Sequence, residues 1–224
     1  MNMKDIMVRI ILGDVETSGL DEDAGVVEVA WTEIDENLTI KSSFYSRINP
    51  GVPINPAASG VHGITDKDVA DAPTIHEFVG DRLSEGEVLL VAHNAAFDQR
   101  FFKPHFSSLF GTLCTLKMAR LIYPDSPNHK LQTLRYFLDL DAGSAHSAAG
   151  DVETLYWLIY RMLEDTNMTF EQLWDMSLRP VLIERMPFGK HKDVPLKDLP
   201  SGYIRWLLSL ADIDDNLRYS LEAL

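Results

Sequence analysis

The first half of the chain alternates between short apolar runs and turn signals. Residues 6–12 form a β-branched and aliphatic run that continues through Asp14-Val15-Glu16, and residues 26–34 and 40–48 also have the pattern of strands. The short connections between these three segments suit antiparallel neighbours. Residues 88–92 form a further apolar run, which predicts a short buried strand.

Helical spacing dominates the remainder of the chain. The clearest case is the segment 147–164, where apolar residues recur at the i, i+3, i+4 and i+7 positions of one helix face. Further helices are expected over residues 74–83, 95–105, 115–122, 130–138, 201–210 and 216–224. Strands that are first consecutive and then separated by helices predict an α/β fold.

The character of the sequence changes near residue 176. Several prolines and a cluster of basic residues follow, before the last two expected helices. We therefore expect one domain over residues 1–176 and a small C-terminal unit over residues 181–224. A unit of that length buries little apolar surface, so it would be marginally stable alone.

Composition and charge narrow the possible classes. The chain has 224 residues, of which 46% are hydrophobic, and its formal net charge is −14. A protein that simply coats nucleic acid is usually basic, so an acidic chain with such a partner would need metal ions to supply positive charge locally. The single cysteine, Cys114, rules out an internal disulfide. The apolar run at the start is too short to span a bilayer, so we expect a cytoplasmic protein without a membrane partner.

Two carboxylates end the first predicted strand. Asp14 and Glu16 are residues i and i+2 of that strand, so their side chains point to the same face. Two neighbouring carboxylates repel each other and lose solvation, and a divalent cation such as Mg²⁺ or Mn²⁺ would relieve both costs. The alternative is a pair of solvated side chains at a strand end.

Three later residues are candidates for the same site. Asp98 lies at the start of a helix that follows a strand, and its alternative role is to interact with the helix dipole. Asp151 begins the long helix, on the face whose later positions are apolar. His146 lies five residues earlier, which in a regular helix would place the two side chains about 140° apart. They can converge only if His146 is in the preceding loop, as Ala142-Gly143-Ser144 favours; the alternative is a surface histidine.

Together these residues form three spaced motifs. They read Asp14-x-Glu16-Thr17, His93-Asn94-Ala95-x-Phe97-Asp98 and His146-x-Ala148-x-x-Asp151. Over residues 7–165 the chain resembles the DEDDh family of 3′–5′ exonucleases. The resemblance implies a ribonuclease-H-like fold, with a five-stranded mixed sheet flanked by helices and here a small C-terminal appendage.

The resemblance also implies a catalytic mechanism. Four carboxylates, those of Asp14, Glu16, Asp98 and Asp151, would hold two Mg²⁺ ions, with Mn²⁺ able to substitute. His146 would take a proton from the attacking water, and the product would be a nucleoside 5′-monophosphate. The residues that it implies at the 3′-terminal nucleotide are Thr17, Ser18, Gly19, Leu20, His62 and Asn94. For His62 the alternative is a loop cap, and for Asn94 it is a role in holding the loop in shape.

The tail resembles one DNA-repair subgroup of that family. The resemblance is carried by Phe188-Gly189-Lys190-His191-Lys192 and by the spacing of Tyr203 and Trp206 after Pro195 and Pro200. It implies a free enzyme that acts on single- and double-stranded DNA 3′ ends without a polymerase partner. We expect the two aromatic residues to form the core of the small unit; the alternative is that they touch DNA together with the basic cluster.

The sequence is also compatible with other functions. The same motifs would serve a proofreading subunit of a DNA polymerase or a 3′–5′ exoribonuclease. A catalytically silent nucleic-acid-binding module is the alternative from another class, although all five catalytic residues are present.

Overall fold

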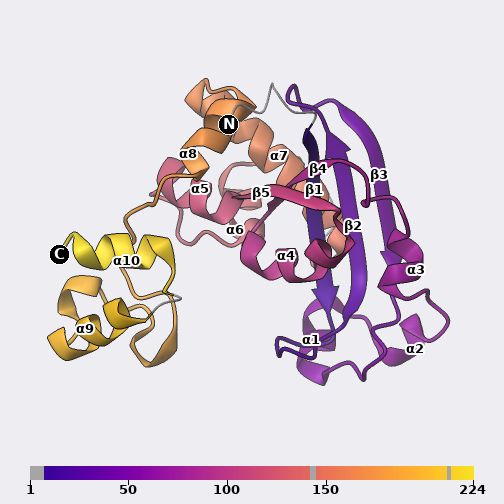
Figure 1. The fold of residues 1–224 in the computed structure, drawn as a ribbon, viewed down its shortest axis with the longest axis horizontal. Helices are drawn as coiled ribbons and strands as arrows, with labels where there is room; N and C mark the ends of the chain where they lie inside the picture. Colours follow the sequence, from indigo (N-terminus) through magenta and orange to yellow (C-terminus); the bar gives the residue numbers. More distant parts are fainter. Residues whose placement is uncertain (1–7, 142–144, 211–212) are drawn as a thin grey trace. The chain divides into compact units, whose positions relative to one another are not determined.

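The computed structural model describes residues 8–141, 145–210 and 213–224 (Figure 1). The chain divides into two compact units, unit 1 (Met1–Trp174) and unit 2 (Asp175–Leu224). The predicted domain limits at residues 176 and 181 stay a prediction. In the described ranges, no helix has both the length and the apolar character needed to cross a membrane.

Unit 1 is built on one mixed five-stranded sheet of order β3-β2-β1-β4-β5. The strands are β1 (Val8–Thr17), β2 (Val26–Ile34), β3 (Ile40–Arg47), β4 (Glu87–Ala92) and β5 (Ser108–Cys114). Strands β1, β2 and β3 pair antiparallel, as their short connections predicted, whereas β4 runs parallel to both β1 and β5. The carboxyl ends of β1 and β4 therefore lie at the same edge of the sheet.

The helices of unit 1 follow the predicted segments with local differences. Their bounds are α1 (Pro56–His62), α2 (Asp66–Val69), α3 (Ile75–Val79), α4 (Ala95–Phe102), η2 (Lys103–His105), α5 (Thr115–Ile122), α6 (Leu131–Phe137), α7 (Ala148–Thr166) and α8 (Phe170–Ser177), the last of which continues into unit 2. Helix α3 is shorter than predicted, because Gly80 at its end has a φ of 48° and leaves the helical conformation.

Strand β5 was not located by the hydrophobic pattern. It lies at the edge of the sheet, and nearly all its residues are partly exposed, so it lacks the continuous apolar run of a central strand. Gly111 in this strand lies under the ring of Trp174, where a Cβ would approach a ring carbon to 2.5 Å. Because only glycine fits there, the strand cannot have a β-branched residue at that position.

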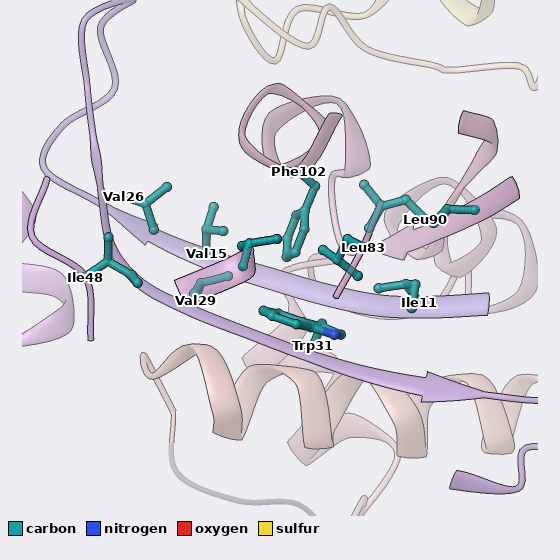
Figure 2. Close-up of a cluster of buried hydrophobic side chains, with 11 residues drawn as sticks. Ile11, Val15, Val26, Val29, Trp31, Ile48, Leu83, Leu90 and Phe102 are labelled. Carbon is teal, nitrogen blue, oxygen red and sulfur yellow. The ribbon is translucent and has the colours of Figure 1, made fainter. Parts of the chain in front are cut away.

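A buried hydrophobic cluster covers one face of the sheet (Figure 2). Trp31 on β2 is fully buried, stacks on Phe44 at 4.9 Å between ring centroids and meets Phe102 of α4 edge-on at 6.4 Å. Gly13 on β1 accommodates the Phe102 ring, since a Cβ there would lie 2.8 Å from a ring carbon. Close packing of β1 against α4 fixes the helix that carries Asp98.

Unit 2 has a hydrophobic cluster of its own. Its elements are η3 (Gly189–His191), η4 (Leu196–Asp198), α9 (Ser201–Ser209) and α10 (Asp215–Glu222). Its buried residues are Met186, Leu196, Leu199, Leu207, Ile213, Leu217 and Leu221. Side chains of α10 anchor the segment after α8: Asn216 Oδ1 accepts the Val181 amide at 3.0 Å, and Ser220 Oγ accepts the Ile183 amide at 2.8 Å.

One expectation for unit 2 is wrong. Tyr203 is partly buried against the cluster, but Trp206 is 52% exposed and is not part of the core. Aliphatic side chains from α9, α10 and the preceding segment already fill the interior, and Trp206 lies on the outward face of α9. The two aromatic residues therefore do not form the core as a pair.

Candidate active site

Three of the predicted ligands meet at the carboxyl end of β1. Asp14, Glu16 and Asp151 each offer a carboxylate oxygen, and these oxygens lie within 4.8 Å of one another. Strand alternation directs the first two to the same face, and the first turn of α7 brings Asp151 to them. The fold thus brings together carboxylates of the first and third motifs, such as Glu16 and Asp151, which are 135 positions apart in the sequence. Their binding of metal stays a prediction.

Asp98 lies beside this group in a different environment. It is 3% exposed, and its Oδ1 accepts a hydrogen bond of 3.3 Å from the backbone amide of Val15. Val15 is the residue between Asp14 and Glu16 on β1. Its charge is the largest electrostatic contribution of any neighbour to Asp14. Among the described residues, Asp98 is not in the group with oxygens within 4.8 Å, although it is close enough to act on the same charges.

The carboxylates have raised pKa values. Burial, followed by the charges of Asp98 and Asp151, raises the pKa of Asp14 well above its usual value. Burial and the charges of Asp151 and Glu28 raise the pKa of Glu16 to about 7. Burial likewise raises the pKa of Asp98 and of Asp151. Each shift shows that negative charge at this position is costly without a cation.

His146 lies in the turn before α7, as the argument from helix geometry required. Its side chain is exposed. Its backbone has a φ of 58°, which is a left-handed conformation, so His146 is not part of helix α7. Burial raises the pKa of Asp151, and the charge and the backbone amide of His146 both act against that rise, which places the two residues close together. Residues 142–144, on which the loop prediction rested, lie outside the described residues.

Glu28 is a fifth carboxylate that the sequence reasoning missed. It lies on β2 directly opposite Glu16 and is 3% exposed. Its Oε2 accepts the backbone amide of Ala148, the first residue of α7, at 2.8 Å, and its Oε1 accepts the Tyr45 hydroxyl at 2.6 Å. Glu28 therefore anchors the end of the helix that carries Asp151. A charged residue within an apolar strand was the signal that could have revealed it.

Gln132 is a second residue that the sequence did not reveal. It lies in the first turn of α6, and its amide donates a hydrogen bond to Oδ1 of Asp151. Its own Oε1 is buried and has no hydrogen-bond partner among the described residues. An unpaired buried oxygen beside a carboxylate group is a favourable environment for a cation or for its bound water.

The donor set fits divalent cations of the magnesium type. All the candidate ligand atoms are oxygens, which hard cations prefer over nitrogen or sulfur. Their mutual repulsion and burial are the costs that a bound cation would remove.

The predicted substrate-contacting residues surround the same strand end. Thr17 and Ser18 are buried and Gly19 lies beside them, whereas Leu20 at the tip of the turn is 84% exposed. The Thr17 hydroxyl donates to the Gly19 carbonyl at 2.7 Å, which holds the turn in shape.

His62 and Asn94 also lie near this edge. His62 Nε2 donates to the Thr17 carbonyl at 3.2 Å, and Nδ1 accepts the Ile64 amide at 3.0 Å, so the ring joins the end of α1 to β1. Burial lowers the pKa of His62. Asn94 is exposed, with a φ of 76°, and its side chain does not cap α4. Their contacts with substrate stay predictions.

The fold and the acidic site together define a nuclease of the ribonuclease-H-like type. The family model described as exonuclease (RNase_T) matches residues 11–159, which is more than half of the chain, and the chain belongs to this family. A second family model, QSregVF_b, whose description names quorum-sensing-regulated virulence factors, matches residues 175–210.

The similarity to exodeoxyribonuclease X, the subgroup that the tail resembles, extends over both units. Exodeoxyribonuclease 10 of Escherichia coli strain K12 is 30% identical over 224 residues, which cover 96% of this chain and 97% of that protein. A structure of exonuclease X in complex with 5′-overhanging duplex DNA is 30% identical, with a TM-score of 0.61, and covers 76% of this chain and 99% of that one.

The PolC-type DNA polymerase III of Bacillus subtilis is 32% identical over 164 residues. Those residues are 69% of this chain but 11% of the polymerase.

Proposed function

We propose that this chain is a metal-dependent 3′–5′ exonuclease that hydrolyses DNA from single- and double-stranded 3′ ends in DNA repair. The observation that carries the proposal is the convergence of Asp14, Glu16 and Asp151 beside buried Asp98 and exposed His146. A relative that is similar over nearly the whole length, and named as an exodeoxyribonuclease, supports DNA as the substrate.

The proposed mechanism assigns each residue one task. Asp14, Glu16, Asp98 and Asp151 would hold two Mg²⁺ ions, with Mn²⁺ able to substitute, as in the two-metal mechanism. When bound, such ions neutralise the charge that develops on the phosphoryl oxygens. His146 would accept the proton of the attacking water, and its exposed position next to Asp151 suits that task. The product would be a nucleoside 5′-monophosphate.

The turn after β1 would seat the 3′-terminal nucleotide. We propose that the backbone of Thr17, Ser18 and Gly19 faces the terminal hydroxyl and that Leu20, which is 84% exposed, packs beside the last base. His62 and Asn94 would complete this subsite. The exposed leucine supports the proposal, because burial against a base would cover apolar surface that is otherwise left in water.

The test is an assay of matched 5′-labelled DNA and RNA oligonucleotides with Mg²⁺ or with a chelator. We expect a ladder that shortens from the 3′ end, requires the metal and disappears in Asp14→Ala. Glu36→Ala, which removes an exposed carboxylate elsewhere in unit 1, should cleave like the wild type. Mass spectrometry of the released nucleotide would identify the 5′-monophosphate.

Each contrary outcome has a definite meaning. Full activity in Asp14→Ala would refute the metal assignment, and faster cleavage of RNA would favour the exoribonuclease. Similarity to the PolC-type polymerases keeps a proofreading role as the second candidate. Activity of the purified chain alone on DNA argues against a need for a polymerase partner.

A further inference from the structure

Unit 2 presents a row of aromatic rings that begins at the edge of its hydrophobic core and continues to the surface. The rings of His191 and Tyr203 have centroids 4.5 Å apart, and Tyr203 and Trp206 stack at 5.3 Å with an angle of 29° between their planes. We call these three residues the aromatic row. Two of them are three residues apart on α9, so they share a helix face.

The outer end of the aromatic row is open to solvent. Trp206 is 52% exposed, and Phe188, which precedes His191 by three residues in the sequence, is 49% exposed. Burying a tryptophan side chain is worth several kcal/mol to a folded protein, so a unit this small gains nothing in stability from leaving one exposed. An exposed indole stacked on a second ring has the geometry of a surface that receives another flat ring.

Positive charge lies beside the same rings. Lys190 Nζ is 5.5 Å from the centroid of the Tyr203 ring, and Lys192 follows on the same loop. Gly189, with a φ of 72°, starts the short η3 turn that brings this loop against Tyr203. Within the described residues, neither lysine pairs with a carboxylate, so both charges are available to a ligand.

The distribution of charge along the chain is uneven. Residues 175–224 contain 7 Lys and Arg residues against 8 Asp and Glu residues, a net charge of −1, which leaves −13 of the total −14 on unit 1. The net charge of unit 1 disfavours contact with a nucleic-acid strand except where metal ions bind, whereas unit 2 is nearly neutral and has a local basic cluster. Unit 2 is therefore the more favourable place for contacts with the phosphate backbone.

We infer that the aromatic row and Lys190 form a second nucleic-acid site, which binds unpaired nucleotides of a single strand by stacking on Trp206. Aromatic rings that stack bases beside cations that contact phosphates are the recurring design of sites for single-stranded nucleic acid. The inference rests on the proposed function, because it requires that the substrate be a nucleic acid. It assigns the site to unit 2, and it identifies the ligand by its chemistry as a single strand.

The test measures binding of a labelled oligo-dT of about 16 nucleotides to the full chain, by fluorescence anisotropy in a chelator that prevents cleavage. We expect Trp206→Ala to weaken binding by about tenfold or more, and Trp206→Phe to retain most of the affinity. Tyr219→Ala is the matched control, because it removes a 45% exposed aromatic side chain from α10 of the same unit. Lys190→Glu should weaken binding and reduce the salt dependence.

A second measurement does not depend on the alanine variant being folded. Binding of oligo-dT should quench tryptophan fluorescence in the wild type, and Trp206→Phe should lose most of that quenching while still binding. Equal affinity of Trp206→Ala and the wild type, or equal quenching in Trp206→Phe, would overturn the inference. An equally large loss in Tyr219→Ala would also contradict it, since the effect would then be general to unit 2.

Cleavage of a short substrate separates this inference from the proposed function. Trp206→Ala should cut a trinucleotide with Mg²⁺ at the wild-type rate. If the wild type cuts DNA but the variants bind normally, the second site alone is wrong. If the wild type neither binds nor cuts nucleic acid, both proposals are wrong.

Discussion

The polar residues around the carboxyl ends of β1 and β4 differ in how their neighbours hold them. Asp98 is fixed by a backbone amide, Asp151 by the amide of Gln132, and His93 by two partners from separate segments. His93 Nε2 donates to the His129 carbonyl at 2.8 Å, which leaves Nδ1 to accept the Thr115 hydroxyl at 3.0 Å. This residue therefore joins the end of β4 to the first residue of α5 and to the segment between α5 and α6.

His93 gives a prediction about the pH dependence of stability. Burial lowers the pKa of His93 to about 4 in the folded protein, whereas an unfolded histidine has a pKa of about 6.5. Between these values the unfolded chain binds more protons, so the free energy of unfolding falls as the pH falls from about 6.5 toward 4. At pH 5 the neutral state of His93 lowers the free energy of unfolding by about 1–2 kcal/mol relative to pH 7.

Urea unfolding of the wild type and of His93→Gln, each at pH 7 and pH 5, measures that contribution. The variant cannot take up the proton, so its loss of stability between the two pH values should be smaller. Because the carboxylates titrate in both proteins, the difference between the two losses isolates His93. Identical losses would show that His93 is not held in the neutral state.

At the scale of elements, the site depends on how α7 begins and where it meets the sheet. Ser147 Oγ accepts the Gly150 amide, and the buried Glu28 carboxylate accepts the Ala148 amide, so two side chains satisfy the free amides of the first turn. A negative charge at the amino end of a helix is also favourable to the helix dipole. The position of Asp151 thus rests on a residue of β2 that is 123 positions earlier in the sequence.

We predict that Glu28→Gln lowers turnover by about tenfold and raises the Mg²⁺ concentration needed for half-maximal activity. The substitution keeps the volume but removes a negative charge next to Glu16, so attraction for cations falls. Tyr45→Phe removes the other hydrogen bond of Glu28 and leaves both the charge and the Ala148 contact, so it should have a smaller effect. Kinetics across a Mg²⁺ titration would measure the turnover and the half-maximal Mg²⁺ concentration of each variant, with thermal melting as a control for folding. An unchanged Mg²⁺ requirement in Glu28→Gln would reduce Glu28 to a structural role.

At the scale of the whole molecule, the proposed catalytic residues and the proposed substrate turn all belong to unit 1. The large hydrophobic cluster of β1, β2 and α4 also lies within unit 1, and unit 2 has a separate cluster. The two units therefore have independent interiors. We therefore expect chemistry at the carboxylates to need none of the side chains that unit 2 buries.

Removal of residues 181–224 should accordingly leave the hydrolysis of a trinucleotide within about twofold of the wild type, while binding of longer strands weakens by tenfold or more. The cut leaves α8 whole, since that helix ends at Ser177. Parallel measurements of the short-substrate rate and of oligo-dT affinity would check both parts. A folded but inactive truncated chain would place part of the active site in unit 2.

Much of the fold followed from local patterns. The aliphatic run of β1 and the apolar stripe of α7 predicted both elements, and the short connections predicted the antiparallel pairs. Strand β5 was missed, because an edge strand with Gly111 beneath Trp174 has no continuous apolar run. Trp206 was misplaced, because sequence spacing cannot tell an aromatic side chain in the core from one on the surface.

The sequence by itself determined the family, because motif spacing is a local property of the chain, and the family resemblance in turn implied the mixed sheet and the acidic residues. Strand and helix periods predicted most of the individual elements but not β5. Tertiary structure decided which distant groups support them. Glu28 reaches Ala148, and Gln132 reaches Asp151, only because the sheet and the packing of α6 and α7 bring those segments together. The raised pKa values of the carboxylates have the same origin, since burial and the proximity of like charges arise when the chain folds.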